Sequence, residues 1–146
     1  MLVTGVDLVE IPRVARLLQR YGDRFLQRVY TPDEIRFSRG RPAELAVRFA
    51  AKEAVSKALG VGVRVLSPAG IGWQEVATLN EASGKPYLIL RGRAKALAQA
   101  QALETWSISL SHDADLAIAF VVALGTLSIS EGPVSTRTPQ ELDEGL

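Results

Sequence analysis

Two carboxylates stand in apolar surroundings where a metal ion or a phosphate group could use them. Asp7 closes an apolar run near the N-terminus, and Glu53 lies in the Ala-rich segment RFAAKEAVSK at residues 48–57. Lys57 follows Glu53 by four residues, so the two side chains share one face of a helix. Carboxylates in so hydrophobic a segment need a partner, and Mg²⁺ held by one or two carboxylates and by substrate phosphates would supply it. Lys57 would then face a phosphate.

Each of these residues also has a simpler explanation. Asp7 or Glu10 could cap the helix that follows the first strand, and Glu53 and Lys57 could form an ordinary surface ion pair of small energy. His112, the only histidine, stands between a serine and an aspartate where a strand enters a turn. A single histidine is more often structural than catalytic, and three contiguous residues do not form a Ser-His-Asp triad, whose members come from separate elements.

Two glycines follow the segment that carries Glu53. Gly60 and Gly62, in the run GVGVR, would let the backbone come close to a ligand, although the run matches neither a Walker loop nor a dinucleotide fingerprint. Gly60 can equally end a helix by adopting the left-handed conformation. The sequence leaves both explanations open.

A series of arginines follows the first strand at spacings of three and four residues: Arg13, Arg16, Arg20, Arg24 and Arg28. On continuous helical turns these cations would form a stripe opposite an apolar face, unless Gly22 interrupts the helix. The stripe is either a solvated helix face or a docking surface for an acidic helical protein. Nucleic acid is a weaker alternative because the formal net charge is only +1.

The composition limits the class of protein. A length of 146 residues fits one domain, and a hydrophobic content of 47% is enough for a core. The chain has no Cys, which excludes disulfides, thiolate metal ligands and a cysteine nucleophile. No stretch approaches the roughly 18 to 20 apolar residues of a membrane span. We therefore expect a cytoplasmic protein that binds neither a membrane nor nucleic acid.

The elements that must position these residues mix helices with antiparallel strands. The expected strands are a short buried one at residues 2–9, a hairpin of residues 71–79 and 87–90, a strand in which Trp106, Ile108 and Leu110 alternate with serines, and a return strand at residues 116–123. The expected helices begin at Pro12 and at the capping box TPDE of residues 31–34, or span residues 43–59, the central helix, and 94–103. This order predicts an α+β domain rather than a doubly wound parallel sheet.

One folded domain should span residues 1–124. Residues 125–146 are rich in Ser, Thr, Pro and Gly and carry one arginine against four acidic residues, Glu131, Glu141, Asp143 and Glu144. This composition predicts a flexible acidic tail.

Three segments together resemble the holo-acyl-carrier-protein synthase family, the small trimeric type of 4′-phosphopantetheinyl transferase. They are GVDLVEIPRV at residues 5–14, RFAAKEAVSKALGVGV at 48–63 and SISLSHDADLAIAFVV at 107–122, joined by SGKPYL at 83–88. The pattern FxxKExxxK is highly specific when it follows an N-terminal GxD at this distance. The resemblance spans residues 1 to 123. It implies a compact fold in which antiparallel strands pack against the central helix.

The resemblance also implies roles for individual residues. The ligands of a Mg²⁺ cofactor would be Asp7 and Glu53, and the catalytic residues would be Glu53, Lys57 and His112. Coenzyme A would contact Arg48, Lys57, Gly60, Gly62 and His112. The carrier protein would contact Arg13, Leu17, Arg20 and Arg24. Glu10 is not assigned to the metal, because the place where larger superfamily members carry a second acidic residue is Val9 in this chain.

The implied reaction transfers the 4′-phosphopantetheine group of coenzyme A to a serine of apo acyl carrier protein and supports fatty acid biosynthesis. The serine hydroxyl would attack the β-phosphate, and adenosine 3′,5′-bisphosphate would leave. Mg²⁺ would neutralise charge on the pyrophosphate. The general base would be Glu53 or a metal-bound water. The family forms homotrimers with active sites at subunit interfaces, so we expect the same assembly here.

Two functions of other classes would use the same residues. A Mg²⁺-dependent phosphohydrolase would need only water, whereas the transferase needs a carrier protein. A non-enzymatic module would bind an acidic partner through the arginine series, and replacement of Asp7 or Glu53 would leave its affinity unchanged.

Overall fold

The structure, a computed structural model, describes residues 1–63 and 69–126. Within them, one antiparallel sheet has the strand order β1-β5-β4, formed by β1 (Leu2–Glu10), β4 (Leu103–Asp113) and β5 (Leu116–Gly125). A second antiparallel pair joins β2 (Val76–Asn80) to β3 (Pro86–Leu90). The helices are α1 (Ile11–Tyr21), α2 (Asp23–Val29), α3 (Pro32–Ser38), α4 (Pro42–Leu59) and α5 (Gly92–Ala100), with a 3₁₀ turn η1 (Trp73–Glu75). The predicted α+β class is confirmed.

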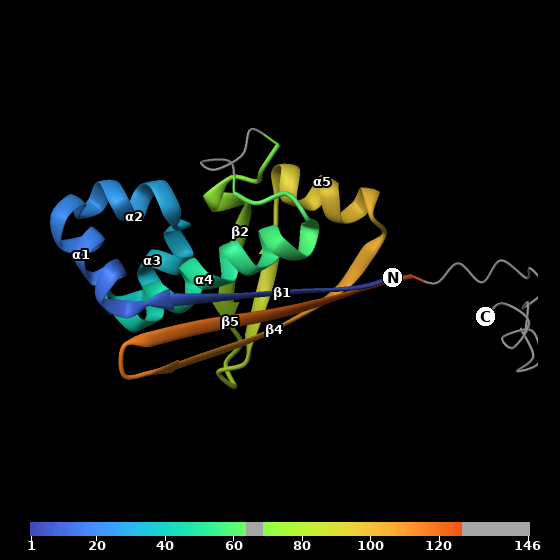
Figure 1. Ribbon diagram of the computed structural model, residues 1–146. Coiled ribbons are helices and arrows are strands. Elements are labelled where there is room, and N and C mark those ends of the chain that lie inside the picture. Colours follow the sequence, from blue (N-terminus) through green and yellow to red (C-terminus); the bar gives the residue numbers. More distant parts are fainter. Residues whose placement is uncertain (64–68, 127–146) are drawn as a thin grey trace, which may run out of the picture.

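Helix α4 is the centre of the molecule. It lies across one face of the sheet, over β1 and β5, while α1, α2 and α3 gather at one end and α5 lies at the other (Figure 1). Pro42 occupies its first turn, and Gly60 ends it in the left-handed conformation with φ 77°. Between these ends most of its side chains are buried, many of them alanines, so neighbouring elements can approach its backbone closely. The central helix predicted at residues 43–59 is confirmed.

The sheet has one buried and one exposed apolar face. Along β5 the buried residues Ala117, Ala119, Val121 and Ala123 alternate with residues that face solvent. The large apolar side chains left exposed on β1 and β5 are Leu2, Val6, Leu8, Leu116, Ile118, Phe120 and Leu124. The prediction of a buried strand at residues 2–9 is therefore wrong for one of its faces, which no part of the described chain covers.

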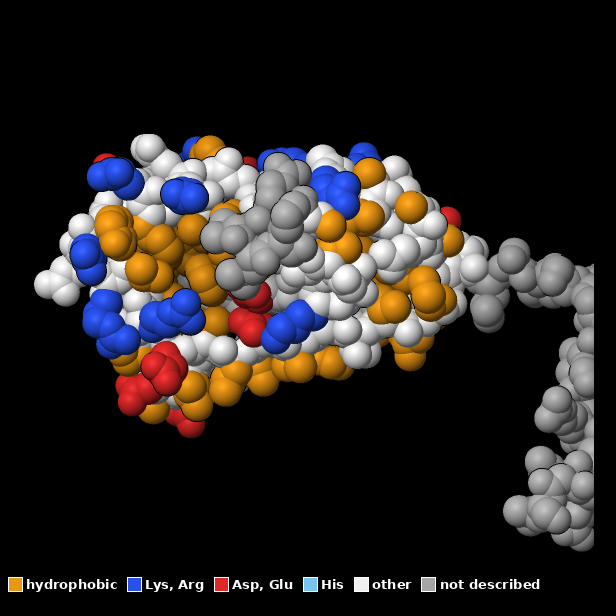
Figure 2. Space-filling view, turned by 45° about the horizontal axis from the view of Figure 1, so that its top comes forward, with side chains coloured by type: hydrophobic (Ala, Val, Ile, Leu, Met, Phe, Trp, Pro, Cys, Tyr) orange, Lys and Arg blue, Asp and Glu red, His pale blue; other side chains and the backbone are white. Residues whose placement is uncertain are grey.

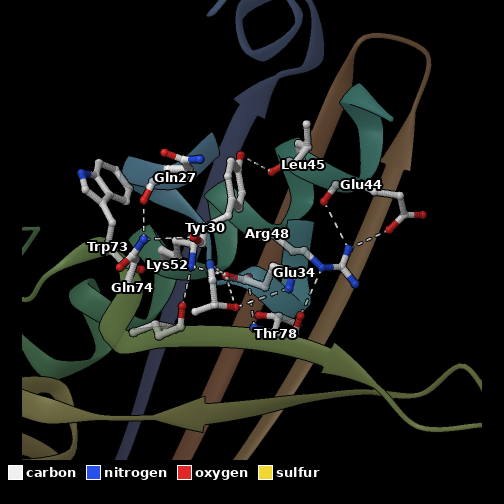
Figure 3. A network of polar contacts seen from close by, with 12 residues as sticks. Gln27, Tyr30, Glu34, Glu44, Leu45, Arg48, Lys52, Trp73, Gln74 and Thr78 are labelled. Carbon is white, nitrogen blue, oxygen red and sulfur yellow. Dashed lines mark hydrogen bonds and ion pairs between the residues drawn. The ribbon is translucent and has the colours of Figure 1, made fainter. Parts of the chain in front are cut away.

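A buried ion pair ties α3, α4 and β2 together (Figure 3). The Lys52 ammonium donates to Glu34 Oε1 at 2.6 Å and to the carbonyl oxygens of Trp73 and Val76 at 3.0 and 2.5 Å. The other oxygen of Glu34 accepts from the backbone N–H of Thr78 at 3.2 Å. Burial lowers the pKa of Lys52, and the adjacent Glu34 carboxylate opposes that effect. These bonds compensate for charges removed from water, as a buried pair requires.

Some local predictions are confirmed and others are wrong. Thr31 and Glu34 form the predicted capping box of α3, and the alternation through Trp106 is that of β4. Residues 71–79 are not one strand, because the 3₁₀ turn η1 separates Ile71 from β2. Helix α5 ends at Ala100 instead of residue 103, because Ala102 has φ 55° and turns the chain into β4.

The predicted tail lies almost wholly outside the described residues. Of residues 125–146 only Gly125, the last residue of β5, and Thr126 are described. The backbone N–H of Thr126 donates to the carbonyl oxygen of Ala102 at 3.3 Å. None of the described helices has the length and apolar character needed to cross a membrane.

Candidate active site

Strand β1 and helix α4 touch backbone to backbone at Gly5. A Cβ atom on this residue would overlap the carbonyl oxygen of Ala54 and lie 3.0 Å from the backbone nitrogen of Ala58. Only glycine fits here, because the obstructing atoms belong to the helix backbone and cannot rotate away. Asp7 follows Gly5 by two residues and so points toward the same side of the sheet as Gly5. The contact therefore brings Asp7 next to the helix that carries Glu53 and Lys57.

Lys57, close to the C-terminal end of α4, binds two atoms of β1. Lys57 Nζ donates to Asp7 Oδ1 at 2.9 Å and to the carbonyl oxygen of Val6 at 3.0 Å. The Asp7 side chain is 16% exposed, and that of Lys57 is 52% exposed. The sequence suggested a pair between Lys57 and Glu53, but the ion pair that Lys57 forms in the structure is with Asp7, fifty residues away.

Glu53 lies within the electrostatic reach of the same groups. Partial burial raises the pKa of the Glu53 carboxyl, and the negative charge of Asp7 raises it further, while Lys57 and Arg13 oppose the shift. A cation near both carboxylates would relieve this repulsion between like charges. The structure thus brings together Asp7, Glu53 and Lys57, with Arg13 nearby.

The donor set fits Mg²⁺ when substrate phosphates complete it. Among residues 1–63 and 69–126 there is no cluster of three or more Asp, Glu, His or Cys side chains that could hold a metal by itself. Mg²⁺, however, is commonly bound through one or two carboxylates plus phosphates and water. Asp7 and Glu53 would supply those carboxylates.

The helix-capping explanation of the acidic residues does not hold. Glu10 occupies the N-cap position of α1, but its side chain makes no capping hydrogen bond. Asp7 lies three residues before that position and pairs with Lys57. The carboxylate of Asp7 is therefore not needed for the start of α1.

The glycines at the end of α4 have a clear structural role. Gly60 takes the left-handed conformation, and its N–H donates to the carbonyl oxygen of Lys57 at 3.0 Å. Gly62, with φ 71°, donates to the carbonyl oxygen of Ser56 at 3.4 Å. These bonds end the helix two residues beyond Lys57, so both glycines follow this lysine closely along the chain.

His112 lies apart from the carboxylates within one chain. It is exposed on β4 and pairs with Ala117 of β5, on the same side of the sheet as Asp7. Since β5 separates β1 from β4, the backbones of Asp7 and His112 are about 10 Å apart or more. His112 is therefore not a direct neighbour of Asp7 within the sheet.

Arg48 is a structural residue. Its guanidinium is 0% exposed and donates to the carbonyl oxygen of Thr78 at 3.1 Å, to the Glu44 carboxylate at 2.7 Å and to the Asn80 side chain at 2.5 Å (Figure 3). It also stacks over the ring of Phe37. Because its donors are used inside the protein, the structure gives no support to the predicted contact with coenzyme A.

The predicted arginine stripe is divided between two helices. Gly22, with φ 54°, ends α1, and α2 starts at the next residue, so Arg24 and Arg28 belong to a different helix from Arg13 and Arg20. All of these arginines are exposed. Figure 2 shows basic side chains around an apolar patch at this end of the molecule.

The exposed arginines of α1 and α2 form one surface, which we call the arginine surface: Arg13, Arg16, Arg20, Arg24 and Arg28. Two adjacent hollows lie on it. One, of about 400 Å³, is lined by Leu17, Tyr21, Arg24, Phe25 and Arg28. The other, of about 470 Å³, is lined by Arg13, Arg16, Leu17, Gln19, Arg20 and Tyr21. Leu17 and Tyr21 line both hollows, so an aliphatic and an aromatic residue lie between two groups of cations.

Sequence reasoning missed the roles of two residues next to the site. Lys52 stands beside Glu53 in the helix, but its side chain enters the core and binds Glu34. The signal was available, since a lysine among alanines and valines needs a buried partner. The close contact at Gly5 was signalled only by a glycine within an apolar strand, which often marks a close backbone approach.

Comparisons with known proteins identify the family of this chain. The family model of the 4′-phosphopantetheinyl transferase superfamily matches residues 4–121, and the chain belongs to this superfamily. A curated holo-[acyl-carrier-protein] synthase of Herpetosiphon aurantiacus is 48% identical over 127 residues, which cover 86% of this chain and 100% of that protein. A synthase of the same description from Koribacter versatilis is 41% identical, over 84% of this chain and 97% of that protein.

The solved structures that superimpose on this chain belong to the same family. The crystal structure of Helicobacter pylori holo-[acyl-carrier-protein] synthase in complex with coenzyme A superimposes with a TM-score of 0.73 at 31% identity, covering 83% of this chain and 99% of that one. The Neisseria meningitidis synthase gives a TM-score of 0.72 at 34% identity, over 84% and 97%. Within the superfamily the relationship is therefore with the holo-acyl-carrier-protein synthases, as the motifs predicted.

The contact at Gly5 predicts a sharp effect of one methyl group. Gly5→Ala should move β1 away from α4 and separate Asp7 from Glu53 and Lys57, which should lower turnover by about 100-fold, as misplacement of a catalytic group by 1 Å can do. The turnover number of the native protein and of Gly5→Ala is measured on folded protein, and the melting temperature of both is determined in parallel.

Gly125→Ala is the matched control. Its Cβ would also meet backbone atoms, at 3.1 Å from the carbonyl oxygen of Ala102, but at the Leu2 end of the sheet, six residues along β5 from Ala119, the partner of Asp7. This variant should lose stability and keep its activity. Equal losses of activity in both variants would show that the Gly5 contact does not position the site.

Proposed function

We propose that this protein transfers 4′-phosphopantetheine from coenzyme A to a serine hydroxyl of an apo acyl carrier protein, in the presence of Mg²⁺. The observation that carries the proposal is the meeting of Asp7, Glu53 and Lys57 at the contact between β1 and α4. Two carboxylates and an ammonium suit a reaction at a pyrophosphate, where catalysis consists mainly of positioning and charge stabilisation.

The transfer exchanges one phosphorus–oxygen bond for another. The carrier serine oxygen attacks the β-phosphorus of coenzyme A, and the bond from that phosphorus to the bridging oxygen breaks. Adenosine 3′,5′-bisphosphate leaves with the bonding electrons. Asp7 and Glu53 would hold Mg²⁺, and the ion would supply charge neutralisation at the pyrophosphate.

The chain's own groups bind and orient the phosphates. Lys57 is half exposed and carries a compact positive charge on a flexible stem, so it can reach a phosphate oxygen. Gly60 and Gly62 let the coenzyme pass close to the backbone at the end of α4. The raised pKa of Glu53 suits this carboxylate, directly or through a water, to accept the serine proton.

The exposed sheet face supports a homotrimer. Four of its large apolar residues, Val6, Leu8, Ile118 and Phe120, are 37–59% exposed, and hydrophobic side chains line the lower edge of the view in Figure 2. Contiguous apolar surfaces of this kind mark protein interfaces. In a trimer, His112 would complete the site of a neighbouring copy, because it lies too far from Asp7 within its own chain.

The arginine surface supports docking of an acidic carrier protein. Arg13, Arg20 and Arg24 are exposed around Leu17 and its two hollows. Complementary charge of this kind steers association and fixes the orientation of a partner. The carrier would insert an apolar residue near Leu17 and pair its carboxylates with the arginines.

The transfer itself is tested by the mass of a purified apo carrier after incubation with this protein, coenzyme A and Mg²⁺. The carrier should gain one phosphopantetheine, about 340 Da from its formula, and the gain should vanish with EDTA or in Glu53→Gln, which weakens the metal site. Breakdown of coenzyme A without any gain would indicate a phosphohydrolase. If no reaction is seen with several carriers, the protein would be interpreted as a binding module without enzymatic activity.

The docking surface predicts a selective effect on carrier affinity. Arg24→Glu should raise KM for the carrier about tenfold or more and leave KM for coenzyme A unchanged, because reversal of one interface charge acts on encounter and on pairing. Arg93→Glu, on α5 at the other end of the molecule, is the control. A similar rise in KM for both variants would show that the effect is one of net charge.

The trimer predicts a change of mass in solution. The native protein should sediment with the mass of three chains, and Phe120→Glu should sediment as a single chain, because a charge in the apolar face opposes its burial. Tyr87→Glu, at an exposed aromatic of β3, should remain a trimer. A native protein that sediments as one chain would refute the assembly.

A further inference from the structure

The ammonium of Lys57 and a divalent cation compete for the same carboxylate. Lys57 Nζ lies 2.9 Å from Asp7 Oδ1, which is close to the best geometry for a charge-assisted hydrogen bond. Asp7 is also one of the two carboxylates that would hold Mg²⁺. The carbonyl oxygen of Val6, at 3.0 Å from Nζ, fixes the ammonium on the strand side of the site.

Lys57 also balances the charge of the whole site. Asp7 and Glu53 repel each other, and Lys57 opposes that repulsion through its contact with Asp7 and through its field at Glu53. A divalent cation would relieve the same repulsion. Once it is bound, the ammonium would lie within a few ångströms of a double positive charge, where it is no longer stabilised.

The lysine has room to leave Asp7. Its side chain is 52% exposed and its stem has four rotatable carbons, so the ammonium can move without disturbing the core. The glycines that end α4 lie one turn beyond it, where the phosphates of the substrate would pass. A phosphate oxygen would offer the ammonium the negative charge that it loses at Asp7.

From these contacts we infer that Lys57 is an exchangeable counter-ion: it neutralises Asp7 until a divalent cation takes that carboxylate, and it then binds a phosphate of coenzyme A. This inference rests on the proposed function. Its consequence is that the same lysine opposes binding of the metal alone and favours binding of the nucleotide. The two ligands therefore bind in a coupled way through one side chain.

Removal of the charge should change the two affinities in opposite directions. Lys57→Gln should bind Mn²⁺, measured by electron paramagnetic resonance without coenzyme A, about threefold to tenfold more tightly than the native protein, because one nearby positive charge is gone. The same variant should bind coenzyme A about tenfold more weakly in the presence of Mn²⁺, because a charge-assisted contact to phosphate is lost. Lys57→Arg should stay near the native Mn²⁺ affinity because it keeps the charge.

Two further variants make the outcome decisive. Lys95→Gln, at an exposed lysine of α5, should leave both affinities unchanged and controls for net charge. Asp7→Asn should abolish Mn²⁺ binding and thereby locate the ion. If Asp7→Asn abolishes binding but Lys57→Gln binds Mn²⁺ no more tightly, or more weakly, Lys57 is only a structural support and the inference is overturned. If the native protein binds Mn²⁺ neither alone nor in the presence of coenzyme A, or Asp7→Asn does not affect binding, the metal site of the proposed function is wrong and the inference falls with it.

Discussion

The backbone contact between β1 and α4 is the constraint on which the candidate site depends. A strand and a helix normally keep their backbones apart by the thickness of their side chains, but at Gly5 the carbonyl oxygen of Ala54 occupies the space of a Cβ atom. This closeness lets Lys57, on the helix, reach both a side-chain oxygen and a backbone carbonyl of the strand. It also places Glu53 within the field of Asp7. With a larger residue at position 5, Asp7, Glu53 and Lys57 would all still be present, but they would no longer lie close to one another.

Helix α4 can support this site because adjacent residues on it serve different purposes. Lys52 points into the core, where its bonds to Glu34 and to two carbonyl oxygens hold α3 and β2 against the helix. Glu53, the next residue, is half-buried at the site. Loss of one partner of a buried pair costs about 3 to 5 kcal/mol, because the other charge stays in the core without compensation. The Lys-Glu dipeptide of the family motif therefore combines an anchor of the fold with the proposed ligand of the site, and the anchor fixes the rotation of the helix on which Glu53 lies.

The sequence was most informative where a local rule decides the structure. The capping box at Thr31, the left-handed stop at Gly60 and the alternation through Trp106 each follow from a few neighbouring residues, and the structure has all of them. Contacts between distant residues were harder to foresee. The pairing of Lys57 with Asp7 spans fifty residues, so the sequence offered the nearer Glu53 instead. The burial of Arg48 depends on acceptors in β2, which helical periodicity does not reveal. For the same reason, the sequence showed that Asp7 and Glu53 are unusual carboxylates but could not show that they meet.

The separation of His112 from the carboxylates links the site to the exposed face of the sheet. Asp7 and His112 both face the α4 side of the sheet, but β5 stands between the strands that carry them. The opposite face, with Phe120 and Ile118 exposed, has apolar surface that water does not stabilise. If burial of that face joins copies of the chain, the edge strand β4 of one copy is free to approach a neighbour. Assembly would then determine which histidine faces each pair of carboxylates, so that the apolar face acts on catalysis although none of its residues contacts the substrate.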